Sequence, residues 1–179
     1  KKDTSLLHHL IGSRSLVWNL AKNDIKKKFA GSYFGVVWAF VQPVITVLLY
    51  WFVFEKGLNS KATDLRTGIE IPFVLWLTAG LVPWFYFQEA LNGGTGVLVE
   101  YSYLVKKVVF QIDMLPVVKM ISALFTHLFF VAFTIVLFIC MGYMPDWYAL
   151  QVIYYSFCMI LLATGLVYAT SAVTVFFRD

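Results

Sequence analysis

The residues of this chain that could do chemistry are suited to binding, because those suited to breaking covalent bonds are few and scattered. Its 179 residues include three histidines and two cysteines. They form no Ser/His/Asp or Cys/His constellation, and no metal-ligand spacing surrounds Cys140 or Cys158. The glycine-rich stretch 92–96 lacks the Lys-Ser/Thr ending of a phosphate-binding loop. We therefore expect no catalytic residue, no metal site and no nucleotide-hydrolysing site in this chain.

A stripe of small and polar side chains is its most distinctive binding feature. The stripe consists of Gly35, Ala39, Gln42, Thr46 and Tyr50. Spacings of three and four residues place these side chains on one face of a helix. Because such a face is poorly used against lipid, we expect it to contact a neighbouring helix or a cavity. From the spacing alone, helix packing is the favoured interpretation.

The stripe lies in the first of four long apolar runs. They span residues 36–54, 73–91, 120–141 and 152–177. Each is long enough, at about 1.5 Å per helical residue, to cross a hydrocarbon core about 30 Å thick. Only 13% of the residues are charged and 60% are apolar, whereas a soluble domain carries about 25% charge. The sequence therefore predicts an all-α membrane protein with four transmembrane helices.

The basic residues orient these spans. Eleven of the fourteen lysines and arginines precede the first run, lie between the second and third, or follow the fourth. Four spans would place these segments on one side of the membrane, and the positive-inside rule assigns that side, with the N-terminus, to the cytoplasm. The net charge of +4 then reflects contact with anionic membrane lipids. Because no basic stripe lies outside these flanks, a nucleic-acid surface is the weaker interpretation.

Residues 16–29 have the pattern of an amphipathic helix that lies in the membrane interface without crossing it. Its expected apolar face is formed by Trp18, Ala21, Ile25 and Phe29. Lysines, including Lys22 and Lys26, project elsewhere. Periodicity alone favours a membrane-surface anchor, with a docking surface for a cytoplasmic partner as the alternative. We expect residues 1–34 to form a cytoplasmic segment and residues 35–179 a transmembrane domain.

Three further features have simple interpretations. Residues 92–96, Asn-Gly-Gly-Thr-Gly, are expected to break the second helix near Glu89. Residues 97–119 are apolar and basic, and predict a short cytoplasmic helical connection between the second and third spans. His127 lies in mid-membrane, where an interhelical hydrogen bond is favoured over a proton relay.

Five stretches in order carry a family resemblance. They are FAGSYFGVVWAFVQP at 29–43, GLVPWFYF at 80–87, YLVKKVVF at 103–110, DMLPVVK at 113–119 and VFFRD at 175–179. From about Leu16 onward the chain resembles the membrane subunit of polysaccharide-exporting ABC transporters of the type-2 permease class. That class exports O-antigen, capsule and teichoic acid chains. Gln111 stands where the family often has proline, and the family has six spans. We therefore expect a truncated six-span permease, with a shortened protein as the alternative.

The resemblance implies a transport subunit that works with other chains. Two permeases would form a homodimer in the inner membrane of a bacterium, with two separate ATP-binding subunits that hold ATP and Mg. The cargo would be a lipid-linked polysaccharide. In this setting the helix at 16–29 is expected to dock the ATPase, together with the cytoplasmic connection. The implied ATPase-coupling residues are Lys22, Lys26, Tyr103, Leu104, Lys106 and Lys107.

The resemblance also gives the stripe a role. Sugars present hydroxyl groups and apolar C–H faces, which suit aromatic rings with a few hydrogen-bonding groups. The implied substrate path contains Trp38, Gln42, Thr46, Tyr50 and Tyr86. Two other functions stay open. One is an ion-coupled small transporter or channel that uses His127 and Glu89, which the few intramembrane charges disfavour. The other is a membrane scaffold without transport activity.

Overall fold

The computed structural model describes residues 14–28, 30, 35–64, 68–102 and 112–177. The helices are α2 (Arg14–Lys28), α3 (Trp38–Trp51), α4 (Phe73–Thr95), α5 (Val97–Glu100), α7 (Leu115–Cys140) and α8 (Gln151–Phe176). Shorter helical turns are η1 (Gly35–Val37), η2 (Phe52–Gly57), η3 (Ile112–Met114) and η4 (Trp147–Leu150). Strand β1 (Ala62–Thr63) pairs antiparallel with β2 (Glu70–Ile71).

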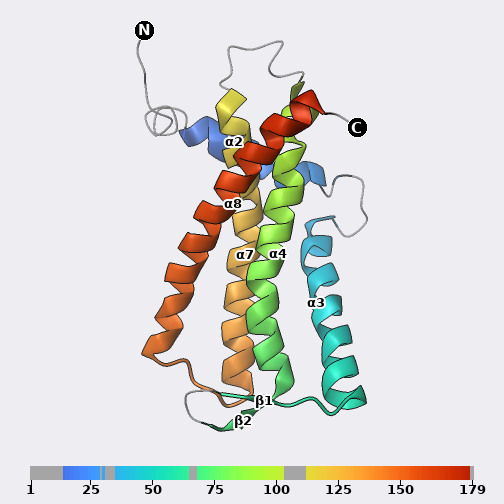
Figure 1. Cartoon of the computed structure of the whole chain (residues 1–179), viewed down its shortest axis with the longest axis vertical. Helices are drawn as coiled ribbons and strands as arrows, with labels where there is room; N and C mark the ends of the chain where they lie inside the picture. The colour runs from blue at the N-terminus through green and yellow to red at the C-terminus, as the bar shows by residue number, and fades with distance from the viewer. Residues whose placement is uncertain (1–13, 29, 31–34, 65–67, 103–111, 178–179) are drawn as a thin grey trace.

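Four long helices, α3, α4, α7 and α8, form an up-and-down bundle (Figure 1). Helix α2 lies across one end of the bundle, and the short β1–β2 hairpin lies at the other. We call these the α2 end and the hairpin end. Helix α8 finishes at the α2 end, as expected for an even number of long helices between α2 and the end of the chain.

Three of the described helical segments are long and apolar enough to cross a membrane. They are Trp38–Gly57, Ile112–Cys140 and Trp147–Phe176. Helix α4 has 23 residues and packs beside α7 and α8, but its last turns carry polar residues such as Gln88 and Glu89. The structure therefore supports a multi-pass helical bundle. The count of four spans stays a prediction.

The main core lies between α4, α7 and α8. It contains Tyr86, Ala90, Met120, Ala123, Ala163 and Val167. The predicted break in residues 92–96 falls at the last of them, because α4 continues to Thr95 and Gly96 ends it. Helix α8 approaches α4 closely at Gly94, where a Cβ would collide with Val167. The glycine is a packing contact inside a helix, which helix contacts can stabilise against local propensity.

Helix α2 packs against α7, but with a different face from the one predicted. Its buried residues are Val17, Ala21 and Asp24, whereas Trp18 is 46% exposed. The first two join Met114 and Val118 in a small core. The placement of Trp18 on a face toward the membrane interface stays a prediction, whereas the burial of Asp24 against protein was not predicted. The prediction considered hydrophobic residues only and therefore left out Asp24.

Helix α3 contacts the bundle through the ring of Phe40, 4.1 Å from that of Phe129 of α7 between centroids, and through its hairpin end. Among its described residues only Val47 is buried, in a cluster with Val74 and Leu75 of α4. A Glu55 carboxylate oxygen accepts a hydrogen bond of 3.3 Å from the backbone N–H of Val74, at the start of α4. A carboxylate there satisfies an N–H that has no partner within its own helix. A cavity runs along α3 from α2 to Tyr50, between α3, α4 and α7.

Candidate functional site

A cavity of about 870 Å³ lies between α3, α4 and α7, with α2 at one end. Ala39, Gln42, Thr46 and Tyr50 all line it, which confirms that the polar stripe faces a neighbouring helix or a cavity. Gly35 is not among the lining residues. It sits just before α3 with a φ of +53°, a conformation that glycine adopts without steric cost.

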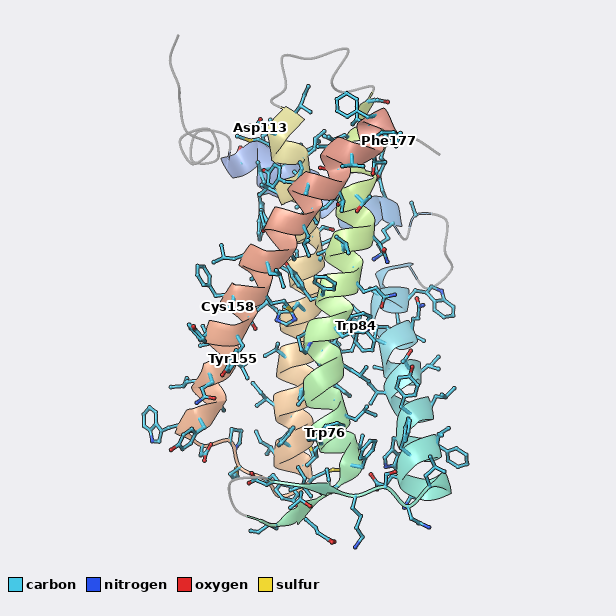
Figure 2. The ribbon with its side chains drawn as sticks, viewed as in Figure 1. Trp76, Trp84, Asp113, Tyr155, Cys158 and Phe177 are labelled. Carbon is cyan, nitrogen blue, oxygen red and sulfur yellow. The ribbon has the colours of Figure 1, made fainter. Side chains whose placement is uncertain are left out.

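Aromatic rings line both sides of the cavity. Trp38 and Tyr50 come from α3, and Trp84 and Phe85 come from α4. Trp84 extends from α4 beside α3 (Figure 2) and is 55% exposed. The rings alternate with amide and hydroxyl groups such as Gln42. This lining combines flat apolar faces with groups that both donate and accept hydrogen bonds.

A buried ionic cluster closes the α2 end of the cavity. The Lys119 ammonium donates to Asp24 at 2.6 Å and to Glu100 at 2.9 Å. The Tyr101 hydroxyl donates to the same Asp24 oxygen at 2.8 Å. These residues come from α2, α5 and α7 and from the residue after α5, so one cluster joins elements distant in sequence. Because Asp24 is 5% exposed, its charge needs these partners.

A second ion pair lies nearer the surface. Lys28 of α2 donates to Glu89 of α4 at 2.6 Å, and their side chains are 49% and 23% exposed. Lys27 lies over the ring of Tyr101, 5.3 Å from its centroid. Each lysine that lines the cavity is therefore engaged by a carboxylate or an aromatic ring.

The structure separates Tyr86 from the other residues of the predicted substrate path. Its side chain is 2% exposed and lies in the core, with its ring centroid 5.1 Å from that of His127. Tyr86 is absent from the cavity lining. The role of Trp38, Gln42, Thr46 and Tyr50 as a substrate path stays a prediction.

The two ionisable residues considered for ion coupling both face protein. The His127 Nε2 atom and the Ser156 hydroxyl of α8 are 3.1 Å apart, which confirms the predicted interhelical hydrogen bond. Glu89 is paired with Lys28.

Of the six predicted coupling residues, the structure describes two, Lys22 and Lys26. Lys22 and Lys26 are exposed on α2, and the Lys22 ammonium lies 5.7 Å from the centroid of the Trp18 ring. Tyr103, Leu104, Lys106 and Lys107 lie outside the described residues. Their role stays a prediction.

Sequence reasoning missed the most buried charged residue, Asp24. Its signal was present, because Asp24 follows Ala21 by three residues and Val17 by seven, and so shares their helical face. A carboxylate on an apolar face predicts a cationic partner. Trp84 and Gln88 were also missed as lining residues, because α4 shows no polar stripe comparable to that of α3.

Residues 15–179 match the family model of the ABC-2 type transporter. The chain belongs to the ABC-2 type transporter family. This confirms the resemblance seen in the five sequence stretches, and it makes this ABC-2 chain a multi-pass integral membrane protein. Such membership indicates a transport component.

One relative of this ABC-2 chain is the O-antigen export system permease protein RfbA of Myxococcus xanthus. The two are 25% identical over 174 residues, which cover 97% of this chain and 64% of the relative. The chain therefore spans somewhat less than two thirds of that permease.

Proposed function

We propose that this chain is the membrane permease subunit of an ABC exporter that moves a lipid-linked polysaccharide across the cytoplasmic membrane. ATP hydrolysis in a separate subunit would drive the movement. Family membership and the O-antigen permease relative support this proposal. The observation that carries it is the cavity beside α3, where aromatic rings and neutral hydrogen-bonding groups line about 870 Å³.

The lining suits a glycan that must bind and then move on. Aromatic rings stack on the C–H faces of sugars without fixing one position. The Gln42 amide can donate to and accept from sugar hydroxyls, and the Thr46 hydroxyl, which donates to the Gln42 backbone carbonyl at 3.0 Å, can accept from them. We assign Trp38, Gln42, Thr46 and Tyr50 to the substrate path and add Trp84. Tyr86 is left out because its ring is buried in the core.

In this proposal four helices cross the membrane, with α4 as the second span. The α2 end faces the cytoplasm, since most of the basic residues flank the spans on that side. The permease acts as a homodimer with two ATP-binding subunits, which hold the ATP and Mg. Residues 1–34 form the cytoplasmic segment, and residues 35–179 belong to the transmembrane domain.

The ATP-binding subunit would contact the permease at the α2 end. ATP-driven closure of the partner can move the spans only if its contacts favour one permease state over another. Lys22 and Lys26 on α2 are exposed for such contacts, and we place Tyr103, Leu104, Lys106 and Lys107 in the same interface. The buried Asp24–Lys119 pair links α2 to the start of α7.

The experiment reconstitutes the chain, in its full-length form, with its partner ATPase in proteoliposomes and measures ATP-dependent movement of lipid-linked glycan. Replacing Lys106 and Lys107 together by Glu should abolish export while membrane insertion stays normal, because like charges would replace the docking contacts. The matched control replaces Lys56 and Lys61, at the hairpin end, by Glu and should keep export.

Two outcomes would contradict the proposal. Export that is unchanged in the Lys106/Lys107 double variant would remove the coupling assignment. Uptake or efflux driven by a proton or sodium gradient, with the permease chain alone, would favour an ion-coupled transporter in place of the exporter.

A further inference from the structure

The charges around the cavity are equal in number, and each described lining lysine contacts a carboxylate or, for Lys27, the ring of Tyr101. Three lysines and three carboxylates are found among the described lining residues. Lys119 contacts both Asp24 and Glu100, and Lys28 contacts Glu89. A lysine whose charge is already met by a carboxylate at 2.6–2.9 Å offers little attraction to an anionic ligand.

All of these charges lie where the helices meet α2. Away from that end, the lining residues described by the structure are uncharged: they are aromatic, aliphatic, small, amide or hydroxyl-bearing. Gln42, Thr46, Gln88 and Thr126 are representative. Amides and hydroxyls both donate and accept hydrogen bonds, as sugar hydroxyls do, whereas a phosphodiester or carboxylate only accepts. The lining therefore matches a ligand with both kinds of group.

In a membrane, the free energy of entering such a cavity differs greatly between an anionic and an uncharged polymer. Removing an anion from water into a site of low dielectric constant is costly unless a fixed cation or several donors compensate it. A polymer with one anionic group in every repeat would meet this cost repeatedly along the cavity. An uncharged glycan would not, and aromatic stacking would still favour its entry.

We infer that the polymer carried through this cavity is an uncharged glycan, and that polyol phosphates and uronic acid chains are not its cargo. The inference rests on the proposed export function and narrows its substrate class. It concerns the repeating chain and not the lipid that carries it.

The first test identifies the charge of the glycan. The gene is depleted in the organism that carries it, and the lipid-linked glycan that accumulates inside the cell is isolated. Mild acid removes the lipid carrier, and the released chain is analysed by anion exchange, phosphate assay and uronic acid assay. We expect a neutral polymer. An acidic polymer would overturn the inference and leave the export function standing, whereas no accumulation of glycan would overturn the export function itself.

The second test uses a matched pair of charges at one position of the lining. Gln42→Lys and Gln42→Glu are each placed in the full complex with its ATPase, with Gln42→Met as the uncharged control, and export is measured per inserted protein. An uncharged cargo predicts similar losses for the Lys and Glu variants, both larger than the loss for Met. An anionic cargo predicts that Glu exports at least about tenfold less than Lys. That asymmetry, or its reverse, would overturn the inference.

Discussion

The two walls of the cavity differ in how firmly they are held. The wall formed by α4 and α7 is backed by α8 and by a core that contains Ala90, Ala123 and Val167. The wall formed by α3 buries one described side chain, Val47. Since buried apolar contacts provide most of the stability of packed helices, α4 and α7 form the fixed wall. The position of α3 sets the width of the cavity.

The ion pairs at the α2 end show the same contrast. The pair between Asp24 and Lys119 belongs to the fixed wall, and its side chains are 7% and 12% exposed. The pair between Lys28, the last residue of α2, and Glu89 of α4 is much more exposed. We therefore expect substitutions on the fixed wall to reduce stability. Substitutions on the α3 side should chiefly change export.

The largest expected effect follows from removing Lys119. Lys119→Met should lower the free energy of unfolding by about 3–5 kcal/mol, because it leaves the buried carboxylate of Asp24 without its cation. Thermal unfolding of the detergent-purified complex measures this change. Replacing both partners, as Lys119→Met with Asp24→Leu, should recover part of the loss. A single variant as stable as the wild type would show that the cluster is not buried as described.

An intermediate effect is expected at the contact between α4 and α8. Gly94→Ala should cost about 1–3 kcal/mol, because its added methyl group collides with Val167 and forces the helices apart. Gly80→Ala on the same helix is the matched control, since a Cβ there meets nothing within 4 Å. Thermal unfolding compares the two variants. Equal melting temperatures would contradict the close approach of α4 and α8.

The smallest effect on stability is expected at the exposed pair. Glu89→Gln should change the free energy of unfolding by less than about 1 kcal/mol, as is usual for ion pairs near the surface. The same variant should alter export, since it releases the contact between α4 and the end of α2 beside the cavity. Parallel assays of unfolding and transport measure both quantities. A large loss of stability would show that this pair holds α2 to α4 more firmly than its exposure indicates.

The residues that sequence reasoning located correctly are those with a regular pattern. The stripe on α3 was found because Ala39, Gln42, Thr46 and Tyr50 repeat with the period of a helix, and all four line the cavity. The long apolar runs likewise appear as the four long helices. These patterns depend only on local geometry, which the sequence contains directly.

The misses depend on contacts between distant segments. The end of α4 was predicted too early because Gly93 and Gly94 suggested a break. Gly94 instead makes room for Val167, which lies in another helix, α8. The burial of Asp24 on α2 was not predicted because its cationic partner, Lys119, is 95 residues away. Tyr86 was placed in the substrate path by its family stretch, whereas packing against α7 and α8 buries it. Periodicity on one segment carries no information about such partners.

The most direct test of the account asks whether the glycan touches the lining of the cavity. A photo-crosslinking amino acid is placed at Thr46, which lines the cavity, or at Ile45, which is 53% exposed on α3 and does not line it. The full complex is irradiated in cells during export, and attached glycan is detected on the purified chain. The account predicts ATP-dependent attachment at position 46 and little at position 45. Equal attachment at both positions, or none at 46 while export continues, would contradict it.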